Sequence, residues 1–183
     1  DNPQLLQERM RQAYEENDLV VISGGSSVGT KDHTAEIISS LGKPGVVFHG
    51  MAVKPGKPTL GGVVEQKPVI GLPGHPAAAL IAFELLVSPL LRFGGYHELP
   101  TGIPPIDALL SRSIGSGPGR EEYIFVKLQR KQGEVLAEPV LGKSGLLSPL
   151  VEADGLMRIP LESEGTAAGS IVGVYLFGTD YVL

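Results

Sequence analysis

The sequence of 183 residues contains no cysteine, and only 5% of its residues are aromatic. The lack of cysteine excludes disulfide bonds and thiolate metal sites, and it is typical of reducing compartments, so we expect a cytoplasmic location. A net charge of −5 argues against an extended phosphate-attracting surface and therefore against nucleic acid as a partner. No apolar run approaches the roughly 18 to 20 residues of a membrane span, so no membrane partner is expected.

The composition predicts a globular protein of two small domains. Hydrophobic residues make up 42% of the chain and charged residues 19%, which allows a real core and argues against disorder. We expect an α/β domain over residues 1–95 and an all-β domain over residues 96–183, with a linker at 94–104. An amphipathic helix, Pro3 to Asn17, precedes the first strand. A sheet seldom opens this way, so we expect the N-terminus to be an interior cut.

The chain is organised around a strand that runs into a glycine-rich loop. Leu19 to Ile22 are apolar and largely branched, as in a central parallel strand, and His33 to Leu41 has helical character. Strand, glycine-rich loop and helix together present N–H groups to an anion. Asp32, directly before the helix, is either an N-cap or a ligand of Mg²⁺ that bridges to an oxyanion. The loop's candidate binding residues are Ser23, Gly24, Gly25, Ser26, Ser27 and Gly29.

A second strand, Gly45 to Val53, is followed by the loop Lys54-Pro55-Gly56-Lys57-Pro58. Each lysine precedes a proline, which favours an extended or polyproline conformation. Polyproline II has three residues per turn, so Lys54 and Lys57 would point the same way and place two ammonium groups on one anionic ligand. The alternative is a pair of solvated loop lysines.

A third strand, Pro68 to Gly71, leads through a turn into an almost wholly apolar helix, Pro76 to Arg92, which we expect to be buried. Pro76 near the first helical position leaves free N–H groups at the turn. In a parallel sheet all three loops would lie at the carboxyl edge and converge on one crevice. His75 by itself favours a structural role over metal binding. The turn's candidate binding residues are Gly71, Pro73, Gly74, His75 and Pro76.

The remainder of the chain predicts a small barrel or sandwich, because short apolar runs alternate with glycine, proline and serine. Arg120 follows a Gly-Pro-Gly turn, and its guanidinium suits a bidentate contact to phosphate or carboxylate, although a solvated arginine is equally consistent with the pattern. Ser144 lies in the sequence Gly-Lys-Ser-Gly. The predicted strands are Ile106 to Leu110, Tyr123 to Leu128, Val135 to Val140, Leu156 to Ile159 and Ile171 to Phe177.

Together these motifs resemble the MoeA-type molybdopterin molybdenumtransferases, which include the gephyrin E domain. The resemblance rests on residues 23–29 with Asp32, the Lys-Pro-Gly-Lys-Pro loop at 54–58 and Gly-Leu-Pro-Gly-His-Pro at 71–76. It continues into the β domain through Gly119-Arg120, Ser144-Gly145 and residues 153–156, so it covers essentially the whole chain. The implied fold is a three-layer α/β domain like that of MogA and MoaB, truncated at its N-terminus, with a parallel sheet and a following β domain.

The resemblance implies the last step of molybdenum cofactor synthesis, in which molybdate is inserted into adenylylated molybdopterin with Mg²⁺ and AMP is released. By position, Asp32 matches the acidic residue near the pterin phosphates and the metal, and Lys54 and Lys57 match the lysines near molybdate and phosphate. Arg120 and Ser144 match contacts from the C-terminal domain. The family also implies a homodimer and a MogA-type adenylyltransferase as partner.

Two departures from the family pattern bear on this interpretation. His75 replaces the usual asparagine, and the family's first two domains and the opening half of its third have no counterpart in these residues. We therefore expect this polypeptide alone not to perform the insertion. The alternatives are a MogA/MoaB-like or CinA-like protein that binds molybdopterin or a nucleotide, against which the lysine loop and the β domain argue, and a non-catalytic scaffold of gephyrin type.

Overall fold

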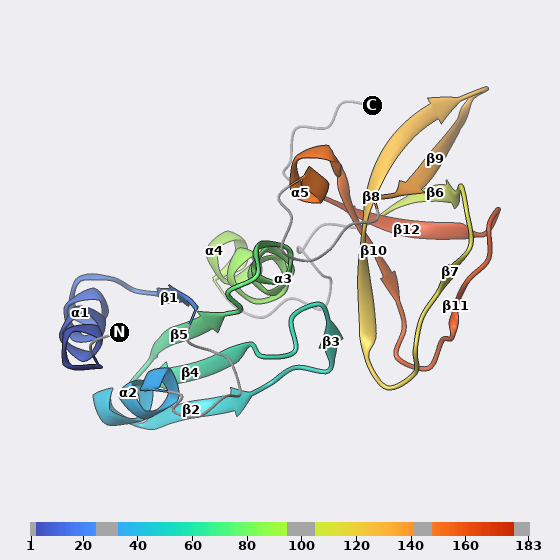
Figure 1. Cartoon of the computed structure of the whole chain (residues 1–183). Helices are drawn as coiled ribbons and strands as arrows, with labels where there is room; N and C mark the ends of the chain where they lie inside the picture. Colours follow the sequence, from blue (N-terminus) through green and yellow to red (C-terminus); the bar gives the residue numbers. More distant parts are fainter. Residues whose placement is uncertain (1–2, 25–32, 95–104, 141–147, 178–183) are drawn as a thin grey trace. The chain divides into compact units, whose positions relative to one another are not determined.

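The computed structural model describes residues 3–24, 33–94, 105–140 and 148–177. The chain divides into two compact units, which contain the separate sheets of Figure 1. Unit 1 comprises residues 1–51 and 56–82, and unit 2 comprises residues 52–55 and 83–183. The segment 52–55 thus belongs to unit 2, although both of its neighbours in the sequence belong to unit 1. Most of the predicted linker and the predicted boundary at 95/96 lie outside the described residues.

Unit 1 is built on a four-stranded sheet. β1 and β5 are parallel, whereas β4 is antiparallel to both of its neighbours, so β2 runs in the same direction as β1 and β5. The prediction of a parallel sheet is therefore wrong for one strand, and the sheet is mixed. The predicted strand from Gly45 to Val53 is also too long, because β2 ends at His49. The strand order is β1 (Val20–Ser23), β5 (Lys67–Leu72), β4 (Leu60–Val64) and β2 (Pro44–His49).

The missed strand β4 contains two glycines, which weaken the sequence pattern of a strand. Close packing explains their presence. A Cβ atom at position 62 would lie 2.6 Å from Cγ2 of Ile38, which is fully buried, and a Cβ atom at position 61 would overlap the ring of Phe48. Gly61 and Gly62 therefore let neighbouring side chains pack directly against the backbone of β4.

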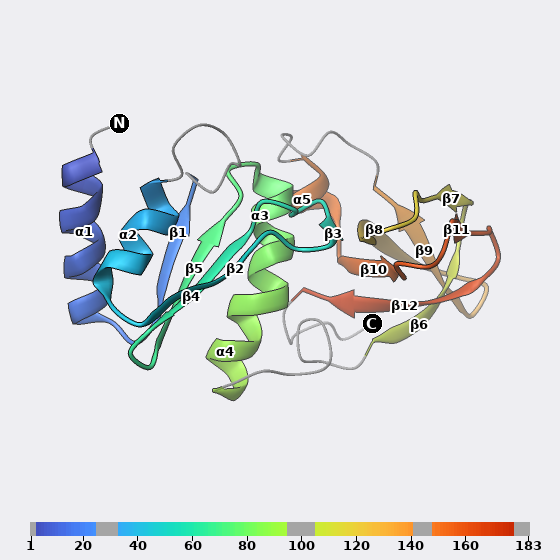
Figure 2. The same cartoon turned by 90° about the horizontal axis from the view of Figure 1, so that it is seen from below.

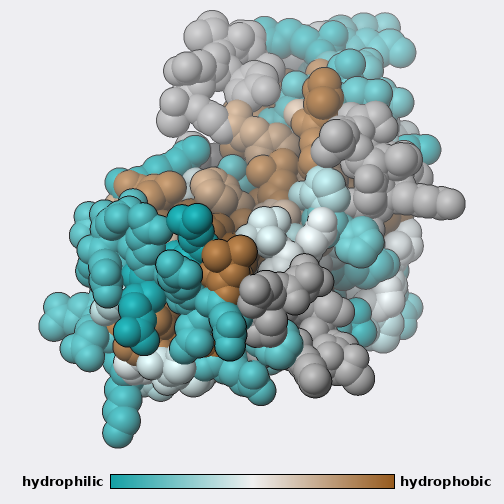
Figure 3. Space-filling model, turned by 60° about the vertical axis from the view of Figure 1, so that its left-hand side comes forward, coloured by the Kyte–Doolittle hydropathy of each residue, from teal (hydrophilic) through white to brown (hydrophobic). Residues whose placement is uncertain are grey.

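Helices α1 (Pro3–Glu16) and α2 (His33–Leu41) pack with the sheet around a common core. α3 (Pro76–Ala82) lies on the other side of the sheet (Figure 2), so unit 1 is an α/β unit with helices on both faces. The surface on the α1 side of the molecule is mostly hydrophilic, with smaller hydrophobic areas (Figure 3), as expected for an amphipathic helix. The buried core residues are Met10, Val20, Ile37, Ile38, Leu60, Val64 and Val69.

The predicted apolar helix extends from Pro76 to Phe93 as α3, the π-helical turn η1 (Phe83–Val87) and α4 (Ser88–Phe93). Gly94 ends it with a left-handed conformation and an N–H bond to the Leu90 carbonyl. The expectation that no segment approaches the length of a membrane span is wrong, since these 18 residues have the required length and composition. Core helices share both properties, and 44% of this helix is buried. The prediction of a buried helix therefore holds only in part, because Leu91 is 65% exposed.

Glu84 is a buried acidic residue in the π-helical turn. It is 8% exposed, and its Oε2 atom has no hydrogen-bond partner among the described residues. Burial raises the pKa of this carboxyl group, whereas the hydrogen bond with Ser88 and the charge of Arg92 act in the opposite direction. The folded chain therefore holds this proton more tightly than the unfolded chain does.

Unit 2 is a small β-barrel. Five strands join in a ring because β10 pairs with both β12 and β8, and the two-residue strand β3 (Val53–Lys54) adds to β8 in parallel. All five strands predicted for this region are confirmed. The ring consists of β6 (Ile106–Leu110), β9 (Glu134–Pro139), β8 (Glu121–Lys131), β10 (Gly155–Ile159) and β12 (Ile171–Leu176). The remaining elements are β7 (Ile114–Gly115), β11 (Gly165–Thr166) and α5 (Ser148–Glu152).

Alternate residues of the barrel strands form its interior, as the period of two predicts. Asp154, directly before β10, links this strand to β8, because its Oδ2 atom accepts the backbone N–H of Leu128 at 2.7 Å. Gly155 follows it at a point of close backbone approach to β12. The buried core residues of the barrel are Ala108, Leu110, Val126, Ala137, Met157, Ile159, Val172 and Val174.

Replacing Glu84 with Gln should change how stability depends on pH. The pKa of Glu84 is higher in the folded chain than in the unfolded chain, where it is 4.5. The neutral acid therefore contributes its full stability below pH 4.5, and this contribution is lost as pH rises through the folded-state pKa. Thermal unfolding at several pH values between about 4 and 8 should show that the Tm of Glu84→Gln increases relative to the Tm of the wild type as pH rises. The exposed Glu134→Gln serves as control, and a pH-independent Tm difference for Glu84→Gln would contradict the assignment.

Gly155→Ala should destabilise the barrel. The added Cβ atom would overlap the carbonyl oxygen of Tyr175 and lie 3.1 Å from Cα of Leu176, so the backbone of β12 must shift. We expect a loss of about 2 to 3 kcal/mol in the free energy of unfolding, measured by urea titration. Gly115→Ala is the matched control, because a Cβ atom there meets nothing within 4 Å. Equal losses in the two variants would refute this explanation.

Candidate functional site

In unit 1 the first and third predicted loops begin side by side. The parallel register places Ser23 opposite Leu72, and the N–H of Gly24 donates to the Leu72 carbonyl at 3.2 Å. A Cβ atom on Gly74 would lie 3.9 Å from Cα of Gly24, so the two backbones come close. Gly24 has a φ of +90°, a conformation that favours glycine. The described beginning of the glycine-rich loop thus lies beside the third loop at the carboxyl edge of the sheet, as predicted.

The rest of the glycine-rich loop lies outside the described residues. This range includes Gly25, Ser26, Ser27, Gly29 and Asp32, so the predicted anion and metal ligands in it stay predictions. Ser23, the last residue of β1, is exposed at the start of the loop.

The third loop turns from β5 into α3 at the same edge. Gly71 and Pro73 are buried, and a Cβ atom on Gly71 would lie 3.1 Å from Cβ of Leu60. Gly74 and His75 are exposed, and the helix begins at Pro76 as predicted. The Gly-His part of the turn is therefore the part that a ligand can reach.

The base of the lysine loop belongs to the same edge of unit 1. His49 pairs with Leu60, and Leu60 pairs with Gly71, so the end of β2 aligns with the end of β5. Gly50 donates its N–H to the Thr59 carbonyl at 2.8 Å, and Met51 donates to the Lys57 carbonyl at 2.9 Å. These bonds fix the backbone at Lys57 and leave its side chain exposed.

Lys57 and Pro58 form a turn, in which Thr59 donates both its N–H (3.1 Å) and its hydroxyl (2.6 Å) to the Gly56 carbonyl. The predicted polyproline segment is therefore wrong, because local hydrogen bonds to Gly56 bend the chain. The argument from three residues per turn does not apply to Lys54 and Lys57. That both lysines serve one substrate stays a prediction that rests on the family resemblance.

Lys54 belongs to unit 2, where β3 pairs with the start of β8. The register places Val53 opposite Glu121 and Lys54 opposite Glu122, and the N–H of Glu121 donates to the Ala52 carbonyl at 2.9 Å. The Lys54 ammonium lies 2.9 Å from Oε1 of Glu122. The lysine side chain is 57% exposed and that of Glu122 only 11%.

Arg120 directly precedes β8 and is exposed. Because Glu121 is bonded to Ala52, Arg120 and Lys54 lie at the same end of β8. Unit 2 thus brings together two cationic candidates that are far apart in the sequence. Ser144, the third candidate of this domain, lies outside the described residues.

Sequence reasoning missed Glu122 and its second partner. Oε2 of Glu122 accepts the hydroxyl of Ser116 at 2.8 Å, and the Ser116 N–H donates to the Glu164 carbonyl at 2.8 Å. The available signal was the pair Glu121-Glu122 directly after Gly-Arg. Nothing in the sequence paired it with the lysine loop, because the β3–β8 contact joins distant segments.

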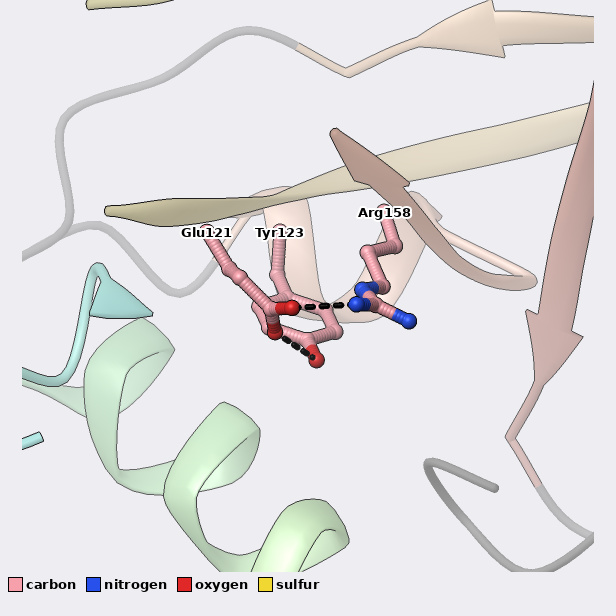
Figure 4. Close-up of polar contacts among 3 residues, drawn as sticks. All are labelled: Glu121, Tyr123 and Arg158. Atoms are coloured by element: carbon pink, nitrogen blue, oxygen red, sulfur yellow. Dashed lines mark hydrogen bonds and ion pairs between the residues drawn. The ribbon is translucent and has the colours of Figure 1, made fainter. Parts of the chain in front are cut away.

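Glu121 forms a separate cluster with Tyr123 and Arg158 (Figure 4). The Tyr123 hydroxyl donates to Oε2 of Glu121 at 3.0 Å, and Arg158 forms an ion pair with Oε1 of the same carboxylate. Burial raises the pKa of Tyr123 above its usual range, and the Glu121 carboxylate adds to this shift. The tyrosine therefore stays a hydrogen-bond donor, and the cluster joins β8 to β10.

Among the described residues, no group of three or more His, Asp or Glu side chains is arranged to hold a metal ion. This finding does not test the predicted magnesium ligand, Asp32, which lies in an undescribed range. Mg²⁺ usually takes only one or two protein carboxylates together with substrate oxygens, so a larger cluster is not required.

An α/β unit with loops gathered at a sheet edge, followed by a β-barrel with exposed cations, fits two known domain families. Residues 1–92 match the model of a probable molybdopterin binding domain, and residues 107–177 match the MoeA C-terminal region, domain IV. The chain therefore belongs to the MoeA-type family of molybdopterin-binding proteins.

Similar proteins come from archaea and bacteria. A putative molybdopterin biosynthesis protein of Methanocaldococcus jannaschii is 34% identical over 96% of this chain and 40% of that protein. The molybdopterin molybdenumtransferase of Bacillus subtilis is 29% identical over 91% of this chain and 39% of its own length. The crystal structure of the molybdopterin biosynthesis MoeA protein from Pyrococcus horikosii has a TM-score of 0.78 and 38% identity over 98% of this chain and 42% of its own. The chain thus spans about two fifths of these relatives.

Proposed function

We propose that this chain contributes to molybdenum cofactor biosynthesis, in the step that inserts molybdate into adenylylated molybdopterin in the cytoplasm, and that it does not complete this step alone. The observation that carries the proposal is the close approach of Gly24 and Gly74 at the carboxyl ends of two parallel strands. Such an edge suits the phosphate of a bound pterin. The name molybdopterin molybdenumtransferase, carried by relatives such as the Bacillus subtilis protein, supports the reaction.

The two units supply different parts of this chemistry in our proposal. In unit 1, Lys57 and the N–H groups of the exposed residues Gly74 and His75 bind pterin phosphate. In unit 2, Lys54 and Arg120 bind the incoming molybdate. Both lysines are exposed, and the chain as a whole has a net charge of −5, so oxyanion binding depends on such local cations. A reaction between an oxyanion and a phosphoanhydride needs oriented cations and N–H donors more than a nucleophile.

Mg²⁺ is the metal we propose, with Asp32 as its protein ligand beside substrate phosphate oxygens. When bound, it would neutralise charge that develops on the phosphoanhydride. The remaining glycine-rich loop, residues 25–29, and Ser144 would add hydrogen-bond donors to the substrates. A homodimer and a MogA-type adenylyltransferase that supplies the adenylylated pterin are the partners that the family resemblance suggests.

A MogA/MoaB-like or CinA-like function is the second candidate, because the fold and the glycine-rich loop suit it as well. The match of residues 107–177 to the MoeA C-terminal region favours the molybdenumtransferase. A scaffold function of gephyrin type is the third candidate, and no specific observation favours it. Calorimetry that compares binding of molybdopterin with binding of a peptide library separates these functions. A scaffold would bind peptides, and the two pterin-binding functions would bind molybdopterin.

The proposal predicts that Lys54→Ala and Lys57→Ala each weaken oxyanion binding. Each variant loses one charge-assisted hydrogen bond to the anion, so affinity should fall about tenfold. Tm should barely change in Lys57→Ala, whereas Lys54→Ala should also lower Tm modestly, because it leaves the nearly buried Glu122 carboxylate without its cation. Titration calorimetry measures Lys54→Ala with molybdate and Lys57→Ala with molybdopterin. Lys131→Ala, an exposed lysine at the far end of β8, is the control. A large loss of Tm with unaltered affinity would mean that these lysines are structural.

A further inference from the structure

We propose that Glu122 is a positioning residue that holds the Lys54 ammonium ready for an oxyanion, and that Ser116 holds Glu122 in place. This inference rests on the proposed function, since it concerns how the molybdate-binding lysine is oriented. It adds two residues that none of the sequence motifs contains.

Three side chains of the barrel unit, those of Lys54, Glu122 and Ser116, are linked in series by an ion pair and a hydrogen bond. Lys54 Nζ lies 2.9 Å from one oxygen of Glu122, and the Ser116 hydroxyl lies 2.8 Å from the other. Ser116 is itself fixed through its N–H to the Glu164 carbonyl. Each carboxylate oxygen thus has its own donor, so the orientation of Glu122 is fixed from two sides.

The burial pattern leaves the lysine accessible and the carboxylate hidden. Glu122 is 11% exposed at its side chain, whereas Lys54 is 57% exposed. An ammonium group has three donors, and Glu122 takes one of them, so Lys54 retains two donors for a ligand. Arg120, exposed at the same end of β8, adds a second cation beside the carboxylates of Glu121 and Glu122, and the Glu121 carboxylate is already paired with Arg158.

The ion pair is not needed to attach β3 to β8. The backbone bond from Glu121 to Ala52 and the pairing of Val53 with Glu121 already set this register. Pairs with one exposed partner stabilise a fold little, and a nearly buried carboxylate carries a desolvation cost. The benefit of the ion pair between Lys54 and Glu122 is the orientation of Lys54, a long side chain that otherwise loses much rotamer freedom on binding a ligand.

The test compares charge-conserving variants, so that a change in affinity cannot come from a lost negative charge. Glu122→Asp shortens the carboxylate by one methylene group, and Ser116→Ala removes its anchor without touching the ion pair. We expect both to weaken molybdate binding by the 183-residue chain roughly threefold to tenfold in titration calorimetry at fixed ionic strength. Glu121→Asp, the same change on the neighbouring carboxylate that pairs with Arg158, is the matched control and should change affinity less than about twofold.

A double-mutant cycle separates positioning from a general structural effect. In the Lys54→Met background, Glu122→Asp and Ser116→Ala should have no further effect on molybdate affinity, whereas a structural disturbance would weaken it in both backgrounds. Unchanged or tighter binding in Glu122→Asp and Ser116→Ala, while Lys54→Met weakens binding, would overturn the positioning role and leave the proposed function intact. If Lys54→Met does not weaken molybdate binding and Lys57→Ala does not weaken molybdopterin binding, both the proposed function and the positioning role are overturned.

Discussion

The parallel pairing of β1 with β5 is the contact on which the arrangement of unit 1 depends. It aligns Ser23 with Leu72, so the segments that follow β1 and β5 leave the sheet side by side and Gly24 approaches Gly74. The N–H bond from Gly24 to the Leu72 carbonyl extends this alignment by one residue beyond the strands. A slip of one residue would turn the side chains of β1 to the opposite face, so the buried core that fixes the fold also fixes the register at this edge of the sheet.

The sequence predicted those elements whose pattern is local. The apolar run of β1, the helix start at Pro76 and all five barrel strands follow from periodicity and turn residues. Strand β4 was missed because Gly61 and Gly62 have no strand propensity, and only their packing against Phe48 and Ile38 explains them. The polyproline prediction at Lys57 was wrong for a related reason, because hydrogen bonds from Thr59 to Gly56 outweigh the preference of residues before proline.

The candidate site was predictable where it depends on strand ends and unpredictable where it depends on distant pairing. Loops that follow parallel strands must meet at one edge, so the neighbourhood of Gly24 and Gly74 follows from the sequence. The pairing of Lys54 with Glu122 does not, because two residues of β3 carry too little pattern to reveal a partner on β8. Glu122 itself looks like one of many acidic residues until its burial and its two donors are known.

The lysine loop contributes one cation to each unit, and this division would suit the proposed reaction, which has two anionic substrates. Backbone bonds near Met51 hold Lys57 in unit 1, whereas β3 and Glu122 hold Lys54 in unit 2. A single flexible loop would let both ammonium groups gather on whichever anion binds first, and the second anion would lose its cation. Under the proposed function, anchoring each lysine separately would keep one positive charge for pterin phosphate and one for molybdate in a chain whose net charge is −5.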